Sequence, residues 1–143
     1  MGASTSLHLL DGRMSAHALT YGMLRAARTL ELDAPLLQFV LAIDADRVSH
    51  LLDSLSILDP DSPEGRRALR LVRLQRALGD VFGSAERVHR FLDTVEPELG
   101  DTPRALLGMN GGVERVLAYV ERDVRDSLDP GFAGALVEHA ALV

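Results

Sequence analysis

The chain contains no cysteine, no lysine and no tryptophan, and aromatic residues make up only 4% of its 143 positions. The absence of cysteine excludes disulfide bonds and thiolate metal sites, and it agrees with a cytoplasmic location. No run of apolar residues approaches the length of a membrane span. The first residues, MGASTSLHLLDGR, lack the basic start and sustained apolar core of a secretory signal. We therefore expect a cytoplasmic protein without a membrane partner.

All fifteen basic residues are arginine, and they are unevenly distributed along the chain. The formal net charge is −6, yet residues 62–79 contain five arginines and only one acid. An acidic chain with one basic segment is poorly suited to broad phosphate binding, and it allows only a local contact. The simpler interpretation of the basic segment is a solvated helix face that pairs with nearby acids.

Residues that could carry catalysis or bind a metal ion do not occur at the spacings that such sites require. No two of the five histidines have the spacing of metal ligands. No serine lies in a nucleophile-elbow context, and the pair Gly111-Gly112 is too short to be a dinucleotide-binding loop. The acids of residues 96–101 fall in a polar loop, which does not favour acid–base catalysis. We expect no enzyme activity and no catalytic, cofactor-binding or metal site.

The first half of the chain consists of helices with clear start positions. Apolar residues recur at helical spacing from Ser15 to Leu30. Asp33 then caps an almost wholly apolar helix, residues 35–43, which we expect to be buried on all sides. Asp44 caps the next helix, residues 45–55. The residues of this helix that we expect to face inward are Val48, Leu51, Leu52 and Leu55.

Two short helices joined by a tight turn, with a further helix on each side, are the plan of a helix-turn-helix domain. We therefore predict a helix-turn-helix-like unit over residues 1–80. The candidates for contact with operator DNA are Arg47, Ser49, His50, Arg66, Arg70 and Arg73. These side chains can donate to bases or phosphates, whereas Asp46 and Asp53 repel phosphate. A helical pair that only packs, without reading DNA, is an equally weighted alternative.

The following helix runs from Pro63 to about Val81 and is the longest in the chain. Its expected apolar face consists of Leu71, Val72, Leu74, Leu78 and Phe82. The arginines of residues 66–76 fall on the opposite half of the helix. Besides a solvated face, two alternatives are that these arginines contact phosphate groups or that they bind an acidic surface of a partner.

Closely spaced helix starts characterise the stretch from Phe82 to Arg125. Ser84 begins one helix, and Thr102-Pro103 begins a short helix that stops at Gly108. The sequence Asn110-Gly111-Gly112 then begins a longer helix. This helix is expected to place Val113, Val116, Leu117 and Val120 on one apolar face.

The order and spacing of these features are similar to the toxin-binding domain of Xre/MbcA/ParS-type antitoxins. The matching residues are Phe82-Gly83, Phe91-Leu92, Leu99-Gly100, Thr102-Pro103, Leu106-Leu107, Gly111-Gly112, Val116 and Tyr119. The family usually has Trp-Leu in place of Phe91-Leu92 and an Asn-Pro-type loop in place of Glu96-Pro97. The resemblance covers about a third of the chain.

The residues and the resemblance together predict an all-α protein in two parts. Residues 1–80 form a degenerate helix-turn-helix unit, and residues 81–143 form a toxin-binding unit with a C-terminal arm, residues 130–143. The resemblance implies an antitoxin of a type II toxin–antitoxin system. Its partner is a RES-domain toxin that consumes NAD or uses it to ADP-ribosylate a target. Homodimerisation and autorepression of the operon through operator DNA are further expectations, and a transcriptional regulator without a toxin is the alternative.

Antitoxins of this family typically cover the NAD cleft of the toxin with their C-terminal region. In this chain the apolar residues Phe132, Leu136, Ala140 and Val143 form a stripe near the end. From the residues alone, a helix docked on its own core and a segment that orders on a partner are about equally favoured. The resemblance favours a segment that orders on a partner. The predicted toxin-binding residues are Phe132, Leu136, Val137, Ala140, Val143, Asn110, Gly111 and Gly112.

Overall fold

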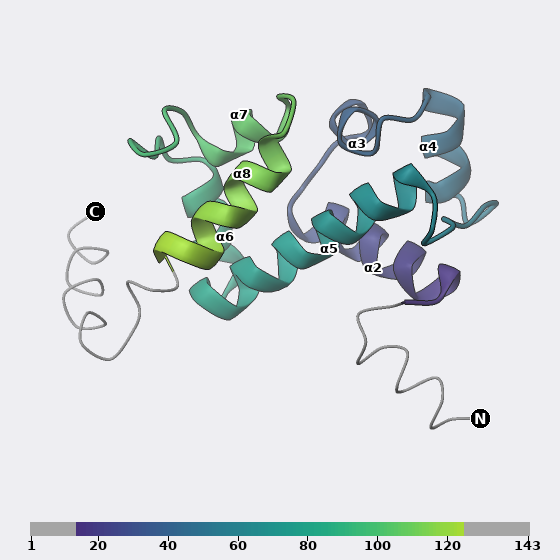
Figure 1. The fold of residues 1–143 in the computed structure, drawn as a ribbon, viewed down its shortest axis with the longest axis horizontal. Helices are drawn as coiled ribbons and strands as arrows, with labels where there is room; N and C mark the ends of the chain where they lie inside the picture. Colours follow the sequence, from purple (N-terminus) through teal and green to yellow (C-terminus); the bar gives the residue numbers. More distant parts are fainter. Residues whose placement is uncertain (1–13, 125–143) are drawn as a thin grey trace, which may run out of the picture. The chain divides into compact units, whose positions relative to one another are not determined.

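A computed structural model describes residues 14–124, and this part of the chain is all-α, as predicted (Figure 1). The described chain divides into two compact units between Val72 and Arg73, within the long helix α5 (Pro63–Phe82). The sequence prediction sets the boundary after residue 80 instead. None of the helices in the described range is long and apolar enough to cross a membrane.

Unit 1 contains α2 (Ala16–Thr29), α3 (Ala34–Leu41), α4 (Ala45–Leu52) and the first part of α5 (Pro63–Phe82). Each of the first three helices begins at a cap whose side-chain oxygen accepts a backbone N–H of the first turn, as predicted for Asp33 and Asp44. The distances are 3.1 Å from Ser15 to Ala18, 2.9 Å from Asp33 to Leu36 and 2.8 Å from Asp44 to Arg47. These bonds satisfy N–H groups that have no partner inside the helix, so local chemistry fixes the helix starts.

A buried threonine fastens the loop after α4 to α2. The Thr20 hydroxyl donates to the Ala16 carbonyl at 2.7 Å and accepts the Leu58 N–H at 2.8 Å. Both Thr20 and Leu58 are buried. A buried backbone N–H without a partner is costly. The bond to Thr20 therefore both satisfies the Leu58 N–H and holds the loop against α2.

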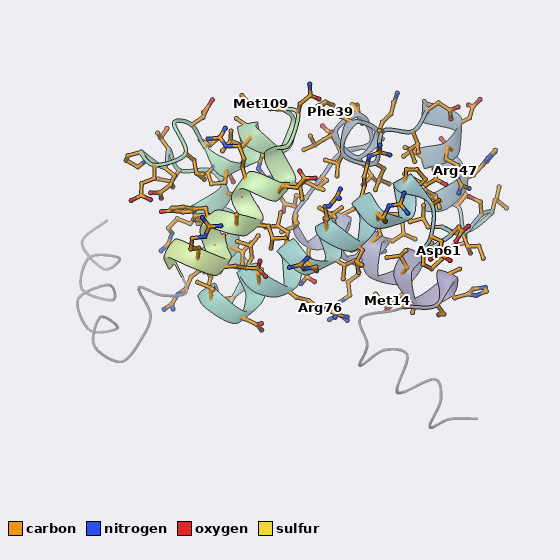
Figure 2. The ribbon with its side chains drawn as sticks, in the orientation of Figure 1. Met14, Phe39, Arg47, Asp61, Arg76 and Met109 are labelled. Atoms are coloured by element: carbon orange, nitrogen blue, oxygen red, sulfur yellow. The ribbon has the colours of Figure 1, made fainter. Side chains whose placement is uncertain are left out.

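The expectation that the helix of residues 35–43 is buried on all sides is wrong. Residues 35–41 belong to α3, which ends at Leu41 before the left-handed Ala42, and only Leu37 and Leu41 in it are buried. Phe39, labelled in Figure 2, is 40% exposed. The apolar composition of α3 therefore leaves an aromatic side chain at the surface of unit 1.

The inward orientation expected for Leu52 and Leu55 is also wrong. Helix α4 ends at Leu52, and Ser54 has a left-handed backbone with φ of 61°. This conformation stops the helix, so Leu55 no longer continues its apolar face. Leu52 is 50% exposed and Leu55 is 72% exposed, whereas Val48 and Leu51 are buried as predicted.

Unit 2 contains the end of α5, then α6 (Ala85–Leu92), α7 (Pro103–Leu107), α8 (Gly112–Tyr119) and a π-helical turn, η1 (Val120–Val124). The predicted caps are confirmed at Ser84, which accepts from Arg87 at 3.3 Å, and at Thr102, which accepts from Ala105 at 3.1 Å. The predicted apolar face of α8 is confirmed as well. Its members Val113, Val116, Leu117 and Val120 are all buried.

The acidic loop between α6 and α7 is a closed turn. Glu96 and Asp101 form an isolated antiparallel bridge, in which the Glu96 N–H donates to the Asp101 carbonyl at 3.1 Å. Gly100 has φ of 85°, a conformation that other residues adopt only with strain. An ion pair of 2.6 Å between Arg104 Nε and Asp93 Oδ1 ties the start of the loop to α7. The loop therefore presents its carboxylates from a defined backbone.

Candidate functional site

Three aromatic residues on which the family resemblance depends meet in unit 2. The ring centroids of Phe82 and Phe91 are 4.9 Å apart with an interplanar angle of 29°. Those of Phe91 and Tyr119 are 6.3 Å apart with an angle of 5°. Both separations lie in the range for favourable aromatic pairs. The three rings join α5, α6 and α8 and are only half-buried, so the cluster reaches the surface.

The glycine pair forms the corner between α7 and α8. Gly111 has φ of 71° and caps α8 without a side-chain hydrogen bond. Gly112 is buried, and a Cβ at this position would lie 1.5 Å from the carbonyl oxygen of Leu106. The two helices therefore approach closely only because residue 112 has no side chain.

The predicted toxin-binding residues in this corner do not have the same surroundings. Asn110 and Gly111 are exposed, whereas Gly112 is buried and serves the packing of α7 on α8. Met109, which the sequence reasoning missed, is 47% exposed directly before them. A large apolar residue preceding a polar Asn-Gly turn is the pattern that indicates it. The other predicted toxin-binding residues, Phe132, Leu136, Val137, Ala140 and Val143, lie outside the described residues.

Arg47, a candidate for base contact, is engaged within unit 1. Its Nη2 atom donates to the Ile57 carbonyl at 3.0 Å and to Glu64 Oε1 at 2.8 Å. The side chains of Arg47 and Glu64 are only 29% and 23% exposed. Arg47 therefore joins α4 to the start of α5 and to the loop between them (Figure 2). The neighbouring candidates Ser49 and His50 are exposed on α4.

Several arginines of the basic segment also contact their own chain. Arg66 donates to the Asp61 carbonyl at 2.6 Å, and Arg67 donates to the Leu41 carbonyl at 3.3 Å. Arg73 pairs with Glu121 at 3.5 Å. These contacts support the interpretation as a helix face that pairs locally, and any phosphate contact by Arg66 or Arg73 would compete with them. Arg70 is half-buried on the same helix.

We expect Arg47→Ala to lower the free energy of unfolding by about 1–2 kcal/mol, because it removes a charge-assisted bond and leaves Glu64 without this partner. Arg25→Ala, an exposed arginine of the same unit, is the matched control and should change it little. Urea unfolding followed by circular dichroism measures both variants. Equal midpoints for the two would show that the Arg47–Glu64 pair has no structural role.

No group of three or more potential metal-ligating side chains is placed to hold an ion within residues 14–124. No protein-family model matches the chain, and a search of characterised proteins gives no match either.

Proposed function

We propose that the chain is the antitoxin of a type II toxin–antitoxin system, and that it neutralises a RES-domain toxin by binding it and occluding its NAD cleft. The observation that carries the proposal is the family pattern from Phe82 to Tyr119. Its aromatic members form one cluster in unit 2, and its glycine pair forms the close α7–α8 corner. The three aromatic members of the pattern therefore lie next to one another in unit 2.

The surface of unit 2 offers two kinds of contact to such a toxin. At the corner, Met109 supplies exposed apolar area beside the exposed backbone of Asn110 and Gly111. At the α6–α7 loop, the backbone bridge between Glu96 and Asp101 encloses a segment that carries three carboxylates, those of Glu96, Glu98 and Asp101. A cleft that binds an anionic cofactor has a positive potential, which an acidic loop complements. The predicted arm would then fill the cleft with apolar side chains.

The experiment that tests the proposal is co-purification. The tagged full chain is co-expressed with the product of the adjacent gene, which we expect to be a RES-domain protein, and the mixture is resolved by size-exclusion chromatography. We expect a stable complex that contains the chain, as a homodimer, and the toxin. Separate elution of the two proteins at micromolar concentration would refute the proposal.

The second candidate function is a DNA-binding regulator, and the arrangement of α3 and α4 favours it. The two helices contact each other through the short turn 42–44, in which Ala42 has a left-handed backbone. Helix α4 presents Ser49 and His50 to solvent. Exposed polar side chains on the second helix of such a pair are typical of base readout.

For this second candidate, we expect Arg70→Glu combined with Arg73→Glu to weaken promoter binding equally for all DNA sequences, as added salt does. His50→Ala should instead reduce discrimination between bases without a general loss. A mobility shift on the upstream region at two salt concentrations, with and without toxin, measures both effects. The acidic chain is expected to bind weakly alone and more strongly in the complex. If the complex at micromolar concentration does not shift its promoter at low salt, unit 1 is a scaffold.

A further inference from the structure

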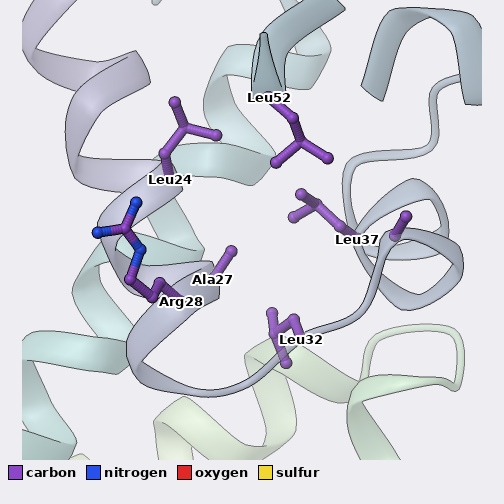
Figure 3. A pocket seen from close by; sticks show the side chains of 7 residues that line it. Leu24, Ala27, Arg28, Leu32, Leu37 and Leu52 are labelled. Carbon is purple, nitrogen blue, oxygen red and sulfur yellow. The ribbon is translucent and has the colours of Figure 1, made fainter. Parts of the chain in front are cut away.

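An apolar hollow opens at the surface of unit 1 between α2, α3 and α4. Its volume is about 170 Å³. The residues that line it are Leu24, Ala27, Arg28, Leu32, Ala34, Leu37 and Leu52. Figure 3 shows the four leucine side chains set around a common opening, with Ala27 on the α2 wall and the Arg28 guanidinium beside Leu24. All seven lining residues belong to unit 1, whereas the proposed toxin contacts at Met109–Gly111 and in the α6–α7 loop belong to unit 2.

The hollow is not closed by the fold of unit 1. Leu52 forms part of its wall and is half-exposed, because α4 ends there and the chain turns away at Ser54. Tyr21, one helical turn before Leu24, is also exposed. Unfilled apolar walls in contact with water are unfavourable, so a ligand that covers them gains the free energy of apolar burial.

The size of the hollow suits one ring or one branched alkyl group. An engineered cavity of about 150 Å³ lined by leucine-like side chains stays dry and binds benzene. The hollow of unit 1 is similar in volume, but it opens to solvent and its lining includes the polar side chain of Arg28 beside the leucines. A ligand could therefore place its apolar part between the leucines and keep a polar group at the opening.

One positively charged side chain, that of Arg28, lines the hollow. Arg28 is the only charged residue that lines the hollow, and it is exposed. Within residues 14–124, no carboxylate or carbonyl group pairs with its guanidinium. Glu31, Asp33 and Asp53 adjoin wall residues in the sequence but do not line the hollow, and the Asp33 carboxylate accepts the Leu36 N–H. The polar group that fits this position is an anion.

We propose that this hollow is a binding site for small apolar monocarboxylates. The ring or branched alkyl group lies between Leu24, Leu37 and Leu52, and the carboxylate lies at Arg28. Because the site exists only when α2, α3 and α4 are packed together, binding of the ligand stabilises folded unit 1 by mass action.

The test uses the full chain and three probes that differ only in the polar group: phenylacetate, benzyl alcohol and benzylamine. Chemical shifts are followed by two-dimensional NMR during titration of each probe. We expect phenylacetate to shift the resonances of the lining residues with a dissociation constant on the order of 1 mM. Benzylamine should bind more weakly than benzyl alcohol, and benzyl alcohol more weakly than phenylacetate.

Two variants separate the contribution of the shape of the hollow to probe binding from the contribution of the Arg28 charge. Ala34→Leu fills the hollow from its exposed edge and should abolish binding of all three probes. Arg28→Gln should weaken phenylacetate binding about two- to fivefold and leave benzyl alcohol unchanged. Arg25→Gln is the matched control, since Arg25 is exposed on the same helix but does not line the hollow, and it should bind like the unmodified chain. Equal affinity for phenylacetate and benzylamine, or unchanged binding by Arg28→Gln, would overturn the proposal.

Discussion

Replacing Gly112 with alanine is expected to lower the free energy of unfolding by about 3 kcal/mol. The added Cβ would lie 1.5 Å from the Leu106 carbonyl oxygen and 2.5 Å from its carbonyl carbon. Both are backbone atoms of α7, so no side-chain rotation relieves the clash. Moving α7 would displace Leu106 and Leu107, which are buried.

The matched control for this substitution is Gly79→Ala. Gly79 lies inside α5, and a Cβ there would meet nothing within 4 Å. Alanine at this position should raise the free energy of unfolding by about 0.5–1 kcal/mol, because it restricts the unfolded chain and favours the helix. Urea unfolding of the two variants measures opposite shifts of the midpoint. An unchanged midpoint for Gly112→Ala would contradict the close α7–α8 approach.

Deleting residues 132–143 is expected to abolish toxin neutralisation and to leave the described helices folded. The deleted segment carries the apolar stripe of Phe132, Leu136, Ala140 and Val143. If these side chains fill the toxin cleft, the truncated chain loses the anchor of the complex. Single changes in the stripe, Phe132→Ala or Leu136→Asp, should weaken the complex by about 2–4 kcal/mol.

Growth rescue in cells that express the toxin, together with circular dichroism of each variant, measures this prediction. Glu138→Gln is the matched control, because position 138 falls opposite the stripe at helical spacing. It should rescue growth as the full chain does. Full rescue by the truncated chain would exclude the arm from neutralisation. A loss of helicity over the whole truncated chain would instead indicate a last helix docked on its own core.

The helix starts could be predicted from the sequence because they depend on local chemistry. Asp33, Asp44 and Thr102 each cap the helix that was assigned to them, since one side-chain oxygen meets an N–H three residues later. The apolar face of α8 could be predicted for a similar reason. Its spacing of three and four residues fixes which side chains share a face.

The helix ends and the distant contacts could not be predicted in this way. Ser54 stops α4 in a left-handed conformation that glycine or asparagine would have indicated, but serine does not. The Arg47–Glu64 pair joins residues that are 17 positions apart, so its formation depends on how α4 and α5 pack. The hollow at Arg28 has the same origin, since it exists only where three helices leave space between them.

The most direct test of the proposed function is a titration of the purified RES-domain toxin with the full chain, with the rate of NAD consumption as the readout. Both chemistries of such toxins consume NAD, so the readout does not depend on which one this toxin performs. If the chain occludes the NAD cleft, the rate falls to zero at a fixed ratio of chain to toxin. A rate that stays unchanged in an excess of the chain would contradict neutralisation by occlusion.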